Sequence, residues 1–514
     1  MAVERNKVGN EQSFLMDLSR GIVGWEDDKD PQNPRNYPPS RKWFLLGIVS
    51  IVTLISPFAS TLFAPAAGYA AQEFGNASSI QSTLAVTAYL FGYAVGPLFL
   101  SPLSELYGRR IVLNVATALF VVFQIGCALA PNIASLIVFR TITGMGGSAC
   151  LTIGGGVISD LFGPEQRGLA MSIFSLGPLL GPVIGPICGA FIAQDIGWRW
   201  IFWVLAITGG TFTTFVIIFN RETNPVILME RKTRKLQKEL DRPELRSCYE
   251  NKDQPRVRTN RAAAVSFLLN RLTTPMRLLI FSPIVTFIAL YIAVLYGCLY
   301  LLFTTVTTVF EDTYHWPLST SGLANIGLGL GFLIGQILFG LTSDRVLKRL
   351  KSRNQNQNNH SDNNNNTTTP EMRLPPAILF APLVPISFFW YGWSVQQPTH
   401  WIVPITGLAP FAVGMIGIFS TLQTYVIDCY PRHAASGIAA ITVTRSLFGA
   451  LLPLAGPEMY RALGYGWGNT LLGLVALLLV PVPVGFYRFG AGLRERGSWS
   501  WIRKPSSTPY GCEY

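Results

Sequence analysis

Charged side chains are scarce in this sequence. Asp, Glu, Lys and Arg together make up 13% of the 514 residues, whereas soluble globular domains carry about 25%. Instead, apolar runs of about 20 residues recur along the chain, and each is long enough to cross a bilayer as a helix. The 48 Gly and 34 Pro fit such helices, because neighbouring helices satisfy the backbone groups that these residues free. The composition therefore predicts an all-α polytopic membrane protein and excludes an ordinary soluble domain.

The residues of metal and catalytic sites are also few. The 7 Cys have no paired spacing, which argues against a disulfide framework or a Cys-based metal site. The 4 His all fall in expected loops or at the ends of apolar runs. The sequence contains no nucleophile elbow and no phosphate-binding loop. We therefore expect no enzymatic activity, no metal and no cofactor.

The net charge of +12 is unevenly distributed. Lys and Arg gather in alternate loops, which is the positive-inside pattern of a membrane protein and not the basic stripe of a nucleic-acid-binding protein. The pattern predicts cytoplasmic termini, a lipid bilayer as the surroundings and no nucleic-acid partner. Because the first 42 residues are polar, we expect no cleavable signal peptide. The twelve expected spans lie near 43–68, 80–104, 111–130, 135–159, 168–193, 199–219, 279–308, 319–343, 375–394, 401–428, 436–457 and 467–489.

The spans form two groups of six on either side of a long polar loop. The expected organisation is a cytoplasmic tail, a six-helix half, a cytoplasmic middle loop, a second six-helix half and a second cytoplasmic tail, over residues 1–42, 43–219, 220–277, 278–490 and 491–514.

Four polar stretches carry separate expectations. The tail 1–42 is expected to be disordered or extended, and the Asn-rich stretch 354–369 to be a disordered insertion. Asn224-Pro225 is expected to open an amphipathic helix, either lying on the membrane surface or forming part of a solvated linker. Asn76 begins an Asn-Ala-Ser sequon in the first outer loop and is a predicted glycosylation site.

The short connection between the second and third expected spans carries Glu105, Gly108, Arg109 and Arg110. Its arginines mark the cytoplasmic face, its glycine allows a tight turn, and its acid lies within reach of the arginines. Asp160, at the end of the fourth span, falls on the same face. The sequence leaves open a charge cluster, an ordinary positive-inside loop or unrelated interfacial charges.

A related pattern recurs in the second half. Asp344 and Arg345 close another long apolar run, at a place equivalent to the first connection. Two copies at equivalent places indicate a duplicated helical bundle.

Two arginines fall inside expected spans. Arg140 lies in the fourth span, and Arg445 lies in the eleventh at a depth of about 12 Å by helical rise. An arginine within a span normally faces a cavity or a partner, although Arg140 could instead extend to the outer surface. Asp and Glu are absent from the middle of every expected span. The sequence therefore offers no obvious proton carrier and disfavours polycationic substrates.

Glycine and proline alternate along the fifth span, at Gly177, Pro178, Gly181, Pro182, Gly185 and Pro186. This spacing predicts one smooth helix face that packs closely against a neighbouring helix.

These motifs resemble the major facilitator superfamily, and in particular its fungal multidrug:proton antiporters with twelve spans. Gly108-Arg109-Arg110, Arg140 with Gly144, Gly177 to Pro186 and Arg221-Glu-Thr match the pattern, whereas Ser101 and Glu105 stand where the family usually has Gly and Asp. The resemblance implies two pseudo-symmetric six-helix halves.

The functional implications follow from the same resemblance. It implies a monomeric exporter in the plasma membrane that works by alternating access and proton antiport. Its substrates would be small amphipathic organic compounds such as drugs, toxins or secondary metabolites. It assigns Arg140 to proton coupling, the charge cluster to holding one conformation and the Gly-Pro face to exporters. A transporter-like sensor and a facilitated-diffusion carrier remain alternatives.

Overall fold

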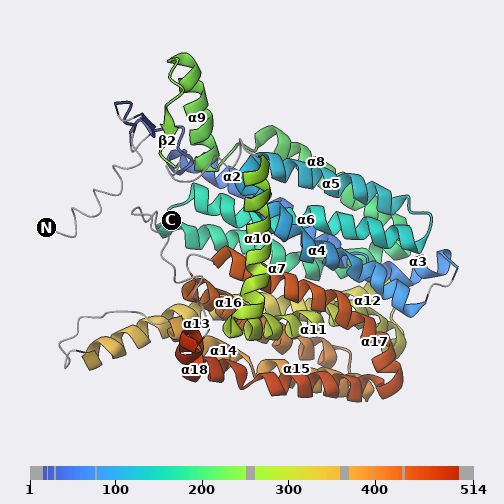
Figure 1. The fold of residues 1–514 in the computed structure, drawn as a ribbon. Coiled ribbons are helices and arrows are strands. Elements are labelled where there is room, and N and C mark those ends of the chain that lie inside the picture. The colour runs from blue at the N-terminus through green and yellow to red at the C-terminus, as the bar shows by residue number, and fades with distance from the viewer. Residues whose placement is uncertain are drawn as a thin grey trace.

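The computed structural model describes residues 16–19, 21–27, 30–75, 78–249, 261–358, 370–397, 399–430 and 434–496. Long helices lie side by side in two groups (Figure 1). The first group contains α2 (Pro39–Thr61), α3 (Ala67–Glu73), α4 (Ser79–Tyr107), α5 (Arg109–Ala128), α6 (Ile133–Leu161), α7 (Pro164–Asp195) and α8 (Trp198–Phe219). The second contains α11 (Pro283–Tyr314), α12 (Leu318–Ser321), α13 (Ile326–Asn358), α14 (Pro375–Phe380), α15 (Leu383–Gln396), α16 (Ile402–Cys429), α17 (Ala434–Leu479) and α18 (Val482–Arg496).

Shorter elements connect these helices. Between the groups lie α9 (Pro225–Glu239) and α10 (Arg261–Phe281), and α10 runs across both groups in Figure 1, where it contacts α4 and α17. The 3₁₀ turns are η2 (Pro34–Asn36), η3 (Ala64–Ala66), η4 (Gly322–Asn325) and η5 (Pro370–Arg373), and the strands are β1 (Ile22–Val23) and β2 (Arg246–Ser247).

The helix ends follow local sequence signals. Ser78 and Asn132 each form a capping box at the start of α4 and α6, so that side chains satisfy N–H groups of the first turn. Gly108 has φ 101° and Gly197 has φ 107°, a region that favours glycine. Gly108 alone joins α4 to α5, and Ile196 with Gly197 joins α7 to α8, so each pair of consecutive helices forms antiparallel neighbours.

The number of spans depends on a break in α17. Among the described residues, 11 helical segments are long and apolar enough to cross a membrane. The last of them contains Gly464 with φ 73° and ψ 172°, which interrupts the helix of 46 residues. Counting the two sides of Gly464 separately gives the twelve predicted spans and confirms an all-α polytopic membrane protein.

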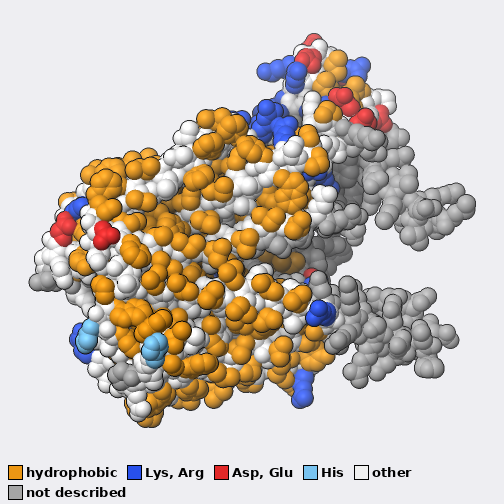
Figure 2. All heavy atoms as spheres, turned by 180° about the vertical axis from the view of Figure 1, so that it is seen from behind, with side chains coloured by type: hydrophobic (Ala, Val, Ile, Leu, Met, Phe, Trp, Pro, Cys, Tyr) orange, Lys and Arg blue, Asp and Glu red, His pale blue; other side chains and the backbone are white. Residues whose placement is uncertain are grey.

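The outer surface of the bundle is broadly apolar. Figure 2 shows hydrophobic side chains spread over the sides of both groups, with charged side chains gathered near their ends. Large apolar residues such as Ile280 and Leu478 are 72% and 77% exposed. A soluble protein would bury such side chains, whereas a bilayer solvates them. The protein is therefore an integral membrane protein.

The helix expected after Asn224-Pro225 is confirmed as α9, which is capped by Asn224, but the surroundings of α9 and of the described part of the tail differ from expectation. β1 pairs with β2 in parallel, and Val23 and Trp25 of the tail pack with Met229 of α9 and with Leu245. The tail thus covers the apolar face of α9, which is neither free to lie on a membrane nor part of a solvated linker. The described residues between 16 and 37 form a small unit with α9 and β2, here called the tail–loop unit, beyond one end of the bundle (Figure 1).

Three boundaries also differ from expectation. Helix α3 occupies part of the expected outer loop, α10 occupies part of the expected middle loop, and α13 continues through Asn358 into the expected insertion. Polar residues can extend a helix beyond an apolar span, so hydropathy alone does not locate its end. Residues 359–369 and Asn76 lie outside the described residues.

Candidate functional site

Several contacts join the two halves, and two regions of them stand out. At the middle of the bundle α4 packs on α17, where a Cβ atom added to Gly449 would lie 3.1 Å from Leu90 and 3.0 Å from Tyr296. Toward the end of the bundle that carries α3, α7 packs on α12 and η4, and the N–H of Ser319 donates to Oε1 of Gln194 at 2.8 Å. The boundary between the halves is therefore formed by α4 and α17 at the middle of the bundle and by α7, α12 and η4 toward this end.

Arg140 lies beside this boundary, inside the first half. Its side chain is 1% exposed, and Nη2 donates to the carbonyls of Ser60 at 3.2 Å and Val86 at 3.0 Å. Its guanidinium also lies over the rings of Phe63 and Tyr89, at 5.1 and 5.6 Å from their centroids. Two carbonyl dipoles and the aromatic faces offset part of the cost of burying the charge. The alternative that Arg140 extends to the outer surface is wrong.

Hydroxyl groups continue from Arg140 into the second half. The Ser60 hydroxyl is 2.8 Å from the Tyr300 hydroxyl, and the Tyr300 ring lies 5.0 Å from the Tyr296 ring. Because Ser60 belongs to α2 and Tyr300 to α11, this hydrogen bond crosses between the halves. Tyr300 escaped the sequence analysis, although Tyr296 and Tyr300 share a helix face by their spacing of four.

A second group of hydroxyls lies next to this path. The Ser56 hydroxyl is 2.8 Å from that of Tyr89 and 2.5 Å from that of Tyr93, and the two tyrosine rings lie 5.1 Å apart. Tyr89 is also one of the rings beneath Arg140. The boundary therefore combines aromatic surface with hydrogen-bonding groups, as sites for organic molecules commonly do.

Arg445 lies on the other side of the boundary. Its guanidinium is 4.9 Å from the centroid of Tyr296 and 5.1 Å from that of Phe419. The side chain is half-buried, and its Nε has no hydrogen-bond partner among the described residues. Tyr296 is thus shared by the path from Arg140 and by Arg445. The two arginines that the sequence singled out lie at opposite ends of one polar and aromatic path.

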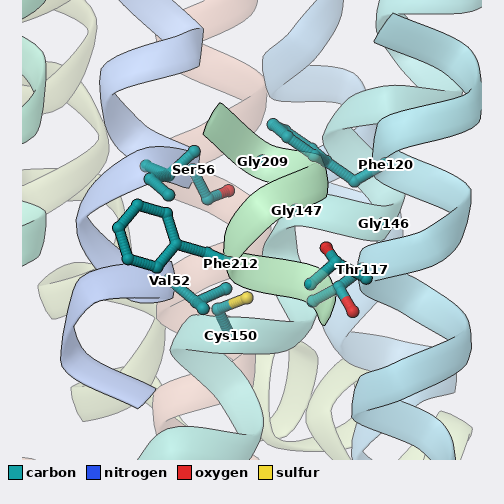
Figure 3. A pocket seen from close by; sticks show the side chains of 11 residues that line it. Val52, Ser56, Thr117, Phe120, Gly146, Gly147, Cys150, Gly209 and Phe212 are labelled. Atoms are coloured by element: carbon teal, nitrogen blue, oxygen red, sulfur yellow. The ribbon is translucent and has the colours of Figure 1, made fainter. Parts of the chain in front are cut away.

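A small pocket lies within the first half, beside this path. Residues of α2, α5, α6 and α8 line it, including Ser56, Thr117, Cys150 and Phe212 (Figure 3). Its volume of about 10 Å³ leaves room for about one water molecule. This pocket is therefore too small for an organic molecule.

The predicted charge cluster brings together Arg109 and Asp160. Arg109 Nε lies 3.5 Å from Asp160 Oδ2, and Nη1 donates to the Ser104 hydroxyl at 2.6 Å. A Cβ atom added to Gly156 would lie 2.9 Å from Arg109 Cζ, so this glycine leaves the space that the guanidinium fills. Glu105 is half-buried in the last turn of α4, and its direct pairing with Arg109 remains a prediction.

A further acid, Glu222, belongs to this cluster and was missed. It is 4% exposed and accepts the backbone N–H groups of Arg109 at 2.9 Å and Arg110 at 3.4 Å. It also accepts those of Thr223 and Asn224, which lead into α9. Helix N-termini favour negative charge because their N–H groups are unpaired. The resemblance to the family at Arg221-Glu-Thr included this residue but did not indicate which groups its carboxylate contacts.

The second half carries a pair equivalent to that of Arg109 and Asp160. Arg373 Nε lies 2.5 Å from Asp428 Oδ2. Arg373 precedes the ninth span and Asp428 ends the tenth, as Arg109 begins the third and Asp160 ends the fourth. Arg345 is exposed on α13, and the side chain of Asp344 lies outside the described residues. The expected role of Asp344 and Arg345 in a charge cluster remains a prediction.

The glycines of α7 lie against α2. A Cβ atom added to Gly177, Gly181 or Gly185 would come within 2.9 Å of backbone or side-chain atoms of α2, and the Thr61 hydroxyl donates to the carbonyl of Pro182 at 2.9 Å. Small residues allow this close approach of helix backbones. Pro178 and Pro186 lie on the same helix, which also contacts the second half. The role of this face in export remains a prediction.

Comparison with known proteins places these features in a family. A model of the Major Facilitator Superfamily matches residues 49–453. The chain is 44% identical to MFS transporter cpaT of Aspergillus oryzae, over 92% of this chain and 91% of that protein. It is 44% identical to MFS-type transporter penM of Penicillium rubens, over 96% and 95% of the two chains. It is 41% identical to efflux pump radE of Floropilus chiversii, over 92% and 85%.

Solved structures share the fold. The xylose transporter XylE from E. coli, in a partially occluded inward-open conformation, superposes with a TM-score of 0.60 at 16% identity, over 88% of this chain and 98% of that one. A bacterial homologue of the human lysosomal transporter Spinster, in an inward-facing conformation, gives 0.61 at 15% identity, over 90% and 99%. The chain therefore belongs to the major facilitator superfamily and is a membrane transporter of small compounds, not an enzyme.

Proposed function

We propose that this protein exports small amphipathic organic compounds from the cytoplasm, across the plasma membrane, as a monomer. The observation that carries the proposal is the path of tyrosines and serines between Arg140 and Arg445 at the boundary of the halves. Aromatic faces suit an organic skeleton, and hydroxyls suit its polar groups. The relative named as an efflux pump supports outward transport, and the close packing of α7 on α2 accords with it.

Alternating access is the proposed mechanism. The contacts of α7 with α12 and η4 close the bundle toward the end that carries α3, which the positive-inside pattern assigns to the outer side. We therefore interpret the arrangement as facing the cytoplasm, with the termini in that compartment. Rocking of the halves about the α4–α17 contact would open the outer side.

Proton antiport is the proposed energy source. Each described Asp or Glu of the spans lies near a helix end, so an acid at an end or the substrate itself would carry the proton, and Arg140 would organise the coupling. Asp160 is an acid at a helix end, and its Oδ2 lies 3.5 Å from Arg109 Nε.

Transport by inside-out vesicles tests this proposal. A vesicle interior made acidic should drive uptake of a labelled exported compound, and a protonophore should abolish the accumulation. Equal uptake with and without the gradient would favour facilitated diffusion. Specific binding without any uptake would favour a sensor.

A further inference from the structure

Arg445 presents an uncompensated positive charge inside the second half. Its contacts are the rings of Tyr296 and Phe419, and no described residue accepts a hydrogen bond from it or forms an ion pair with it. A guanidinium has five N–H donors in a planar fork. Burying such a group without an acceptor is unfavourable, so the site favours a ligand that brings one.

The position of Arg445 on α17 directs it inward. Gly449 and Leu452 share its helix face, because they follow it by four and seven residues. Leu447 and Leu451, on the opposite face, are 37% and 53% exposed toward the surroundings of the bundle. Since Gly449 touches the contact between the halves, Arg445 lies one helical turn from that contact, on the side of the end where α17 begins.

No described acid occupies the interior that could neutralise this charge. The described acids of the spans lie near helix ends, at Glu73, Glu105, Asp160, Asp195, Glu311, Asp312, Glu371, Asp428 and Glu458.

Arg140 differs from Arg445 in this respect. It is 1% exposed, donates to two carbonyls and is enclosed by rings. Arg445 is half-buried and has no such acceptor among the residues that the structure describes. The charge available to a transported molecule is therefore that of Arg445.

We infer that the transported compounds are aromatic organic acids, bound as anions. Their acidic group pairs with the guanidinium of Arg445, and their ring system packs beside Tyr296 and Phe419. Guanidinium and carboxylate form short, charge-assisted and often bidentate hydrogen bonds, whereas an organic cation is repelled at this position. This inference rests on the proposed export function and narrows its substrate class.

Binding of two matched probes tests the inference. The purified protein, in nanodiscs of zwitterionic phosphatidylcholine that offer no anionic lipid, is titrated calorimetrically with 1-naphthoate and with 1-naphthamide. The probes share one ring system and differ in charge. The wild type should bind naphthoate about tenfold more tightly, as expected for one charge-assisted interaction. Equal affinities, tighter binding of the amide or binding of neither probe would overturn the inference.

Variants then assign the preference to Arg445. Arg445→Gln should weaken naphthoate binding by about tenfold and leave naphthamide binding unchanged, and Arg445→Lys should keep part of the preference. Arg461→Gln, at a side chain 71% exposed, is the matched control and should bind both probes as the wild type does. An unchanged preference in Arg445→Gln would overturn the inference. Retained naphthamide binding shows that the Arg445→Gln variant is folded. The comparison of the two probes on the wild type tests the inference even if this variant does not fold.

The export proposal is judged separately. If vesicles accumulate neutral compounds in response to the pH gradient and the nanodiscs show no preference for the anion, export stands and the substrate class is wrong. If naphthoate binds with the expected preference and no compound is ever transported, the anion site stands and export is wrong.

Discussion

The backbone N–H of Arg109 donates to Oε1 of Glu222 at 2.9 Å and so fastens the first residue of α5 to the segment that follows α8. The same carboxylate accepts N–H groups that lead into α9. One buried acid therefore holds together the short connection of the second and third spans and the beginning of the middle loop.

Replacing Glu222 should disturb this junction. Glu222→Gln keeps one acceptor oxygen but loses the charge, and hydrogen bonds to a charged group contribute about 1.5–3 kcal/mol. We expect a lower thermal stability and slower export, with a larger effect in Glu222→Ala. Thermal unfolding in detergent measures the stability, and vesicle uptake measures the rate of export. Glu244→Gln, at an exposed acid near β2, is the control, and an equal loss in both variants would contradict this role.

The pair of Arg109 and Asp160 should affect conformation more than folding. Partly buried at 15% and 13% side-chain exposure, it can contribute somewhat more than the 0–1 kcal/mol or so of an exposed pair. That suffices to bias two states separated by a few kcal/mol. Arg109→Ala should insert normally and turn over more slowly, as measured by vesicle uptake per molecule. Arg109→Asp with Asp160→Arg should recover part of the loss, and recovery no better than Arg109→Asp alone would argue against direct pairing.

The contact of α7 with α2 predicts the effect of a larger side chain. A Cβ atom at position 181 would lie 2.8 Å from the carbonyl oxygen of Leu54 and 2.9 Å from the N atom of Phe58. Gly181→Leu should therefore separate the helices and reduce export several-fold while the protein is still made. Gly47→Leu, at a glycine of α2 with no atom within 4 Å of the added Cβ, should export normally. Similar export by the two variants would refute the close-packing argument.

The tail–loop unit should respond to acid through Asp30. Burial raises the pKa of this carboxyl, but N–H groups of Gln32 and Glu26 and the Lys232 ammonium stabilise its charged form more, so its pKa lies below the ordinary value. A carboxyl whose pKa is lower in the folded than in the unfolded state stabilises the folded state at pH values above its unfolded pKa of about 3.9. That stabilisation is lost as the pH falls through the pKa of the folded state. Docking of the tail should therefore be unchanged from about pH 5 to 8 and weaken below about pH 4.

Hydrogen exchange measures this docking. The amide of Arg246 donates to Gly21 and that of Cys248 donates to Val23, so both amides should be protected while the tail is bound. Asp30→Asn should accelerate their exchange at neutral pH without altering exchange in the spans. Protection that is indifferent to this substitution would show that Asp30 does not hold the tail.

Membrane orientation is open to direct labelling. In a cysteine-free background, Ala77→Cys should react with an impermeant reagent in intact cells, and Asn363→Cys in the expected insertion should react only after permeabilisation. Loss of a glycan in Asn76→Gln would place the same loop outside. The opposite labelling pattern would invert the proposed topology.

The sequence predicted the features that depend on the residues of a single helix. Apolar runs located the spans, and the buried Arg140 and the glycine face of α7 follow from spacing within single helices. The sequence did not predict contacts between segments that are far apart in the chain. The apolar face of α9 is covered by residues some two hundred positions earlier in the chain, and no periodicity reveals that partner. The contacts of Glu222 and Arg373 likewise involve helices that only the folded structure places beside them.

The pairing of β1 with β2 has a consequence for compartments. One strand precedes the first span and the other follows the sixth, so they can pair only if the chain crosses the bilayer an even number of times between them. Parity alone thus places the amino-terminal tail and the middle loop in the same solution, whatever the charges of the loops. A kinase, protease or binding partner that reaches one of these segments has access to the other, and it meets them as a single folded surface.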